Sequence, residues 1–169
     1  MRAFRLTMVI SRSICLLAAA TIAHACFAEA PALTIQGEVY KSTCDASERK
    51  ALRRQLDDAA NGNQAAGLRS LVVTVLCGEG AQADEAMRRA SDPRVKLTVV
   101  STGGDDPTIT RVPRASLRAY GGAAWNAYAD TGDEGISVHF YKNEACMQTL
   151  IFRNRQKAWR LVALAEACD

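Results

Sequence analysis

Hydrophobic positions in the first half of the chain recur with the period of an α-helix. The apolar residues of 45–60 are spaced i, i+4 and i+7, those of 64–77 are spaced i, i+3, i+4, i+7 and i+8, and those of 83–90 repeat this spacing. Asp45 stands three residues before Glu48, the pattern of a capping box at a helix start. The sequence therefore predicts three helices, although the β-branched residues within 64–77 leave a strand as the alternative there.

In the second half of the chain the period changes to two, which is typical of β-strands. Apolar and polar residues alternate over 95–99, and a turn rich in Gly and Asp at 103–107 leads to a returning strand over 108–112. An earlier stretch, 33–40, alternates imperfectly and is predicted to be a short strand. Residues 114–129 carry a helical spacing that two central glycines weaken, and we expect a helix there.

The C-terminal third is patterned as a meander. It holds three alternating segments, 136–140, 146–152 and 158–165, with turn residues at 154–156 between the last two. Helices followed by such strands predict an α+β fold: an N-terminal helical hairpin plus a further helix packed on an antiparallel sheet that ends in a three-strand meander. Because the chain has no internal repeat and no long linker, one domain over 29–169 is expected.

The first 28 residues have the three parts of a secretory signal peptide. Arginines precede an uncharged run over 13–28, and this run of 16 residues is shorter than the roughly 20 that span a bilayer. Small residues place the cleavage site after Ala28, with a cut after Ala25 as the alternative. Cys26 leaves lipid attachment as a further alternative. We therefore expect export, with the periplasm as the compartment and no membrane span after removal of the leader over 1–28.

The net charge of the chain bears on whether its partner is a nucleic acid. The chain has 21 basic and 18 acidic residues, a formal net charge of +3. Arg2, Arg5 and Arg12 lie in the leader, so the mature chain has 21 − 3 = 18 bases against 18 acids and no net charge. A nucleic-acid-binding protein needs a basic excess to displace counterions from phosphates, so we expect no nucleic-acid partner.

Four cysteines remain once the leader, which holds Cys15 and Cys26, is removed. An even number in an exported protein predicts disulfides, and no pair has the Cys-x2-Cys spacing of a zinc site. The four are Cys44, Cys77, Cys146 and Cys168. Three pairings are possible, and the predicted elements favour one of them.

In the helical half, the hairpin brings two cysteines together. If 45–60 and 64–77 are antiparallel helices, Cys44 begins the first and Cys77 ends the second, at the open end of the hairpin. The sequence therefore predicts the disulfide Cys44–Cys77, provided that 64–77 is a helix.

In the sheet half, the meander brings the other two together. A turn at 154–156 places Cys146 opposite about Ala163 or Leu164, and the chain can curl back from there so that Cys168 reaches Cys146. The sequence therefore predicts the disulfide Cys146–Cys168.

Candidate catalytic groups are sparse. The mature chain has one histidine, His139, in mid-strand between hydrophobic residues, and no Gly-x-Ser-x-Gly motif, so we expect no catalysis to depend on it. Asp130-Thr131-Gly132 spells the aspartic-protease triplet once, whereas that chemistry needs two carboxylates. The acidic stretch 130–135 departs from the EF-hand ligand pattern, and Asp105 and Asp106 are interpreted as turn residues. No catalytic residue, metal or cofactor is expected.

Two stretches have the composition of contact surfaces. Residues 120–128 hold three aromatic side chains among small residues, and an acidic turn follows them. The candidate partner-binding residues are Tyr120, Trp125, Tyr128, Asp130, Asp133 and Glu134. Packing of Trp125 and Tyr128 into the core is the alternative interpretation. The basic turn 153–160 is a candidate contact for an acidic partner, with a solvated hairpin tip and Trp159 on the core face as the alternative.

These features favour binding over catalysis. A small exported domain with two disulfides, one histidine and no net charge is expected to be a non-enzymatic inhibitor or immunity-type protein, which neutralises a secreted toxin or cell-wall hydrolase by protein–protein contact. One alternative is a small-ligand binder with a pocket between helices and sheet, lined by Trp125, Tyr128 and Phe140. Another is a hydrolase whose carboxylates no motif marks.

Export predicts a defined mature N-terminus. Sequencing of the protein recovered from the periplasm is expected to start near Glu29, because signal peptidases cut after small residues. A chain found in the cytosol with Met1 intact would contradict export and weaken the disulfide prediction with it.

Overall fold

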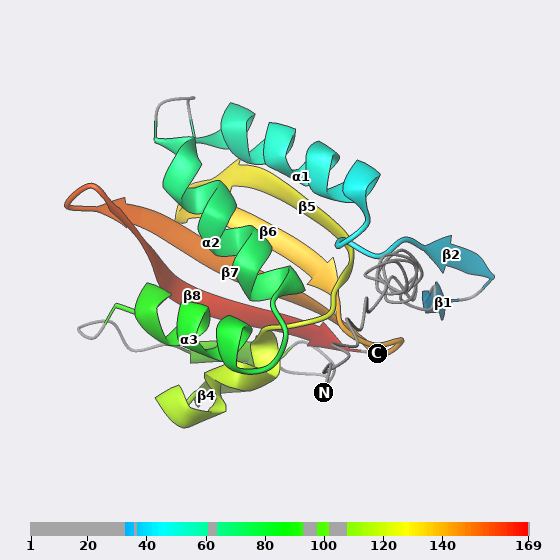
Figure 1. Cartoon of the computed structure of the whole chain (residues 1–169). Coiled ribbons are helices and arrows are strands. Elements are labelled where there is room, and N and C mark those ends of the chain that lie inside the picture. The colour runs from blue at the N-terminus through cyan, green and yellow to red at the C-terminus, as the bar shows by residue number, and fades with distance from the viewer. Residues whose placement is uncertain (1–32, 36, 61–63, 93–97, 102–107, 169) are drawn as a thin grey trace, which may run out of the picture. The chain divides into compact units, whose positions relative to one another are not determined.

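The computed structural model describes residues 33–35, 37–60, 64–92, 98–101 and 108–168. Within the chain, Pro31–Asp169 forms one compact unit, shown in Figure 1. The predicted leader, both of its cleavage sites and Cys26 lie outside the described residues. The division into a leader and one domain therefore stays a prediction.

The N-terminal part of the described chain is a small hairpin followed by three helices. Strand β1 (Leu33–Ile35) pairs with β2 (Glu38–Tyr40), so the stretch predicted as one short strand is two strands that turn at Gly37, whose φ is +87°. The helices are α1 (Ala46–Ala59), α2 (Ala65–Cys77) and α3 (Ala81–Ala90). None of the helices in the described residues is long and apolar enough to cross a membrane.

The three helices predicted within 45–90 are confirmed, with one difference at the start of the first. Asp45 precedes α1, but its side chain makes no capping hydrogen bond, so the predicted capping box is absent. The stretch 64–77 is the helix α2 rather than a strand, and the N–H of Gly78 closes it by donating to the carbonyl of Thr74 at 2.8 Å. An ion pair between Arg69 and Asp57 joins α2 to α1.

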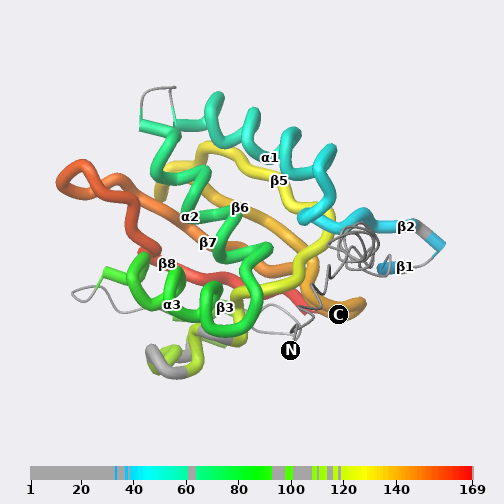
Figure 2. Tube along the Cα trace, in the orientation of Figure 1, coloured from blue at the N-terminus to red at the C-terminus, as the bar shows by residue number. Residues whose placement is uncertain are grey.

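Six strands form the main sheet, in the order β4-β3-β8-β7-β6-β5. Their bounds are β3 Thr98–Ser101, β4 Thr108–Arg111, β5 Trp125–Gly132, β6 Gly135–Tyr141, β7 Cys146–Arg155 and β8 Ala158–Cys168. Strands β5 to β8 follow one another as an antiparallel meander (Figure 2), and β3 joins β8 in parallel. The predicted strand positions 95–97 and the turn 103–107 lie outside the described residues.

The three helices pack on one face of this sheet. Alternate residues of the strands, among them Val138, Phe140 and Leu150, are fully buried in one core cluster with Leu52 and Leu56 of α1. Figure 1 shows α1 lying along β5, while α2 and α3 lie over the part of the sheet nearer β8. The α+β class is confirmed, and the meander has four strands where the sequence predicts three.

The prediction of a helix over 114–129 is wrong. A 3₁₀ helix, η1, covers Arg114–Tyr120, and the chain then enters β5. Between them the N–H of Gly122 donates to the carbonyl of Val75 at 2.7 Å, and Gly122 has φ +87°. At Gly121 a Cβ would lie 3.3 Å from the same carbonyl. The glycine pair thus ends the helix because it lets the backbone cross closely over the end of α2.

The turn between β7 and β8 is later and tighter than predicted. Arg155 pairs with Ala158 across a two-residue turn, in which Gln156 and Lys157 have φ values of +54° and +64°. Two left-handed residues are the conformation of a type I′ hairpin, whose twist matches that of the strands. The turn predicted at 154–156 is therefore displaced.

The displaced turn changes the register at the other end of the hairpin. With a further register shift between Ile151 and Phe152, Cys146 lies directly opposite Cys168 rather than opposite Ala163 or Leu164. No curling of the chain is needed to bring these two cysteines together.

Both predicted disulfides are present. Cys44–Cys77 joins the start of α1 to the end of α2 with a Cα–Cα distance of 5.5 Å, and Cys146–Cys168 joins β7 to β8 with 4.1 Å. Disulfides are typical of proteins in oxidising, extracytoplasmic environments.

The close approach of β6 to β7 at Gly135 can be tested by mutation, with Gly132 as a matched control. Gly135 has φ +137°, and a Cβ there would lie 2.3 Å from the carbonyl oxygen of Phe152. Gly135→Ala is therefore expected to lower the free energy of unfolding by about 3 kcal/mol in urea titrations. Gly132→Ala, where the nearest atom to a Cβ is 3.9 Å away, is expected to change it by less than about 1 kcal/mol. Equal losses in the two variants would contradict the close approach of β6 to β7.

Candidate functional site

The face of the meander opposite the helices carries most of the predicted binding residues. Ala127 and Ala129 of β5 pack against the core, so Tyr128, which lies between them, and Asp130, which follows them, project to the other side. We call this side the outer face. It is defined by Trp125, Tyr128, Asp130, Ser137, His139, Tyr141, Met147, Thr149 and Ile151.

The predicted acidic turn is the loop between β5 and β6. Asp133 and Glu134 are both exposed there, next to the outer face. The Nε of Arg153 donates a hydrogen bond to the backbone carbonyl of Glu134, which ties the turn to β7. The two carboxylates are thus held on a fixed turn.

A polar row crosses the outer face from β5 to β7. Asp130 Oδ2 lies 3.3 Å from Nε2 of His139, and Nδ1 of His139 lies 2.9 Å from Oγ1 of Thr149. These three residues come from neighbouring strands, where the ladder places Tyr128 opposite His139 and His139 opposite Thr149. His139 therefore has two partners, although no sequence spacing marks them.

An aromatic row accompanies the polar one. The rings of Tyr128 and His139 stack with centroids 4.7 Å apart, and those of Tyr40 and Tyr141 lie 4.8 Å apart. Trp125 pairs with Tyr141 across the ladder and lies on the same side. Tyr128 is 42% exposed, so the alternative that it packs into the core is wrong.

Tyr120 lies apart from the other five candidates. It ends η1, is half-buried, and packs against the core on the helix side of the sheet. Burial and the nearby charge of Glu166 raise the pKa of its hydroxyl. The structure thus groups Trp125, Tyr128 and Asp130 on the outer face, with Asp133 and Glu134 at its end, and places Tyr120 elsewhere.

The row from Asp130 to Thr149 has the order acid, imidazole, hydroxyl found in hydrolytic triads. Thr149, however, lies in β7, which pairs with β6 on one side and β8 on the other. The backbone N–H groups of β7 are committed to these ladders, whereas acyl transfer needs free donors to bind the oxyanion. The geometry favours a role for His139 in fixing Asp130 and Tyr128.

The other acidic candidates lie at the end of a strand and in the turn that follows it. Asp130-Thr131-Gly132 ends a strand rather than following a helix, and only one copy is present. Asp105 and Asp106 lie outside the described residues.

The basic turn 153–160 is bound to its own chain. Nη1 of Arg155 lies 3.1 Å from Oδ2 of Asp92, a carboxylate that is 1% exposed. Arg160 donates to the carbonyl of Arg89 at 2.7 Å. These two guanidinium groups hold α3 and the chain beyond it against β7 and β8.

A hollow of about 510 Å³ lies between the start of α2 and the β7–β8 hairpin. Nε1 of Trp159 donates to the carbonyl of Gln64 at 2.8 Å, and Nδ2 of Asn154 donates to Oε1 of Gln64 at 2.9 Å. The lining residues are Gln64, Gly67, Leu71, Asn154, Lys157, Ala158 and Trp159. The predicted lining of a ligand pocket was different: Phe140 is fully buried, and Trp125 and Tyr128 belong to the outer face.

Sequence reasoning missed Thr149, Tyr141 and the hollow at Trp159. The first two follow from the register of β6 with β7, and recognising 125–132 as a strand would have brought Asp130 beside His139. The hollow has no sequence signal because it depends on how the β7–β8 hairpin meets the start of α2.

Comparisons with known proteins give a distant likeness in structure. No family model matches the chain, and no curated protein matches its sequence. A crystal structure of a DUF4783 family protein from Bacteroides fragilis YCH46 aligns over 62% of this chain and 97% of its own, with 13% identity and a TM-score of 0.36. An NTF2-like protein of unknown function from Methylobacillus flagellatus KT aligns over 81% and 98%, with the same identity and TM-score. Neither likeness bears on function.

The electrostatic interaction between Asp130 and Tyr128 on the outer face can be measured. Burial and the charges of Asp130 and Tyr141 raise the pKa of Tyr128. Asp130→Asn is therefore expected to lower the pKa of Tyr128 toward its ordinary value in an NMR titration of labelled tyrosine. Asp58→Asn, at an exposed position of α1, is the control and is expected to leave it unchanged. An unchanged pKa of Tyr128 in Asp130→Asn would contradict the contact.

Proposed function

We propose that this protein is a non-enzymatic exported binding protein that acts through its outer face. In this proposal it is an inhibitor or immunity-type protein, whose partner is another protein such as a secreted toxin or a cell-wall hydrolase. The periplasm is the proposed compartment. The two disulfides support an oxidising, extracytoplasmic environment.

The observation that carries the proposal is the chemical make-up of the outer face. Within the described chain, all three helices pack on the opposite side of the meander. Trp125, Tyr128, His139 and Tyr141 give the outer face large flat side chains that end in polar groups. Such side chains supply contact area at low cost in conformational entropy, which is why they are enriched in protein-binding surfaces.

Charge at one end of the face indicates the character of the partner. Asp133 and Glu134 are exposed on the β5–β6 turn, and among the described residues no Lys or Arg pairs with either carboxylate. Asp130, beside them on β5, contacts only a histidine among the ion pairs described. These three acids favour a partner with basic groups opposite the turn, because complementary charge speeds association and selects the partner.

A second candidate function rests on the hollow between α2 and the β7–β8 hairpin. A volume of about 510 Å³ is within the range of small-molecule sites, and it combines an indole with two amides and an ammonium group. A small polar ligand that contacts Trp159 is the occupant this lining favours.

Photo-cross-linking in the exporting cell tests the first proposal. A benzoylphenylalanine at position 128 is expected to join the chain to one protein, whereas the same probe at position 58 on α1 is expected to join it to none. With that protein purified, Tyr128→Ala and Asp130→Asn are expected to weaken binding at least tenfold, because aromatic and charged groups at an interface centre contribute a few kcal/mol. Asp58→Asn is the matched control for the charge change.

Two results would contradict the outer face as the binding surface. One is unchanged affinity of the cross-linked protein for Tyr128→Ala and Asp130→Asn. The other is binding of that protein that Trp159→Ala abolishes while Tyr128→Ala leaves it intact, which would place the contact at the hollow between α2 and the β7–β8 hairpin. Circular dichroism of each variant checks that the fold is retained.

A further inference from the structure

Two neighbouring rungs of the β7–β8 ladder carry four side chains with metal-ligating atoms. Cys146 pairs with Cys168, and two residues along the strands Gln148 pairs with Glu166. Residues directly opposite share a face, and so do residues two apart on one strand. All four therefore project on the helix side of the sheet, as a compact square at its end.

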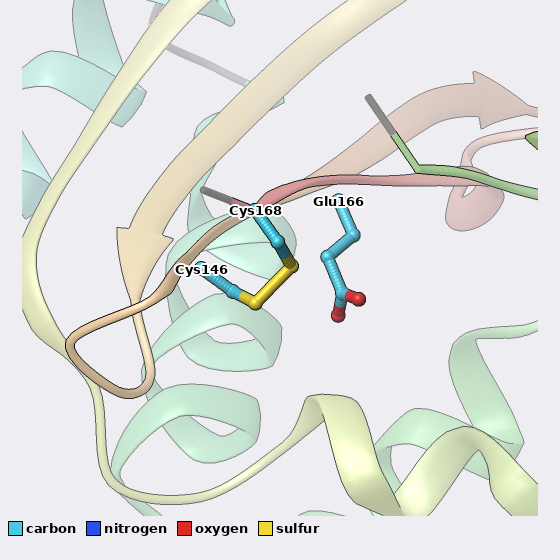
Figure 3. Close-up of side chains that lie close together, drawn as sticks. All are labelled: Cys146, Glu166 and Cys168. Carbon is cyan, nitrogen blue, oxygen red and sulfur yellow. A yellow bond between two sulfur atoms is a disulfide. The ribbon is translucent and has the colours of Figure 1, made fainter. Parts of the chain in front are cut away.

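Distances within this square are short. One ligand atom from each of Cys146, Glu166 and Cys168 lies within 4.8 Å of the others, and Figure 3 shows the carboxylate of Glu166 turned to the same side as the two sulfur atoms. All three residues are half-buried, so ions can reach them. In the part of the chain that the structure describes, this is the one such group of three.

Gln148 supplies a second, independent observation. It is 6% exposed, and its Nε2 donates to Oε2 of Glu166 at 2.8 Å. Its Oε1 is buried and has no hydrogen-bond donor among the described residues. A buried carbonyl oxygen without a partner is costly, and a cation beside Glu166 would satisfy it.

Glu166 keeps its charge available for such a cation. No described Lys or Arg forms an ion pair with its carboxylate. The square thus combines an unneutralised carboxylate, an orphaned carbonyl oxygen and two sulfur atoms.

We propose that reduction of the Cys146–Cys168 disulfide converts this square into a zinc site. The ligands are the two thiolates and the carboxylate of Glu166, with Oε1 of Gln148 as the fourth. Two sulfur and two oxygen donors make a four-coordinate set that suits Zn²⁺, whereas Mg²⁺ and Ca²⁺ prefer oxygen alone. The Nε2 bond of Gln148 holds the carboxylate in place, the role that outer-shell partners have at metal sites.

The chemistry balances with a dithiol as the reductant. The dithiol gives up two electrons and two protons and becomes a disulfide, while the bond between the sulfur atoms of Cys146 and Cys168 breaks to give two thiols. Zn²⁺ then displaces the two thiol protons as it binds. Oxidation reverses both steps and releases the ion, so the oxidised protein keeps only the two oxygen donors.

The Cys44–Cys77 pair is the internal control. It is also a disulfide, but no third ligand accompanies it among the described residues. Full-length chains with Cys15→Ser and Cys26→Ser are used throughout. One variant adds Cys44→Ser and Cys77→Ser, and the other adds Cys146→Ser and Cys168→Ser. After reduction each variant has two thiols, and they differ in the presence of Glu166 and Gln148 nearby.

The test is a titration of each variant with Co²⁺ and then Zn²⁺, after reduction by a phosphine and its removal. The variant that keeps Cys146 and Cys168 is expected to bind one ion per chain, with the thiolate charge-transfer absorption of tetrahedral Co²⁺. It is expected to bind Zn²⁺ at least tenfold more tightly than the variant that keeps Cys44 and Cys77, and at least tenfold more tightly than its own oxidised form.

Glu166→Gln distinguishes a metal site that includes the Glu166 carboxylate from Zn²⁺ binding by two thiols alone. It is expected to weaken Zn²⁺ binding at least tenfold, while Glu144→Gln, at an exposed turn position, is expected to leave it unchanged. A double cysteine variant can fail to fold. Glu166→Gln and Glu144→Gln are therefore also compared in the reduced chain that keeps all four mature cysteines. Equal Zn²⁺ affinity with and without the Glu166 carboxylate, or equal affinity for the two cysteine pairs, would overturn the proposal.

Discussion

The pairing of β7 with β8 is the constraint on which the rest of the structure depends. It is the longest ladder in the sheet, and its register runs from the two-residue turn at Gln156 to the rung of Cys146 and Cys168. Because side chains alternate along a strand, a slip by one residue would exchange the buried set with the exposed set. The register therefore places Leu150 and Leu164 in the core and, through β6, places His139 on the outer face.

Separation of the two faces accounts for the functional proposals. The inner face is filled by apolar side chains beneath the helices, except at its end, where Gln148 and Glu166 lie beside a disulfide. The outer face instead carries an aromatic row and a polar row, and His139 belongs to both. A metal site and a protein-binding surface can thus occupy opposite sides of the same strands without competing for side chains.

Local patterns predicted the three helices within 45–90 and the Cys44–Cys77 disulfide, because apolar spacing and the ends of a helical hairpin are local properties. The Cys146–Cys168 disulfide was predicted from the pairing of β7 with β8, although the turn and register of that pair differ from those predicted. The chain over 114–129 was mispredicted because its apolar spacing fits a helix, while close approach to α2 at Gly121 ends the helix early and lets β5 begin. Because of that error the contact between Asp130 and His139 was not predicted, since it requires β5 to be a strand paired with β6. The orphaned oxygen of Gln148 and the hollow at Trp159 depend on packing between distant segments, which no local pattern records.

Non-reducing peptide mapping of the mature protein by mass spectrometry tests the β7–β8 register most directly. Opposite placement of Cys146 and Cys168 at the end of the ladder predicts one peptide pair joined through these residues, and a second joined through Cys44 and Cys77. A peptide joining Cys44 to Cys146, or Cys77 to Cys168, would contradict the register and the division of the sheet into two faces.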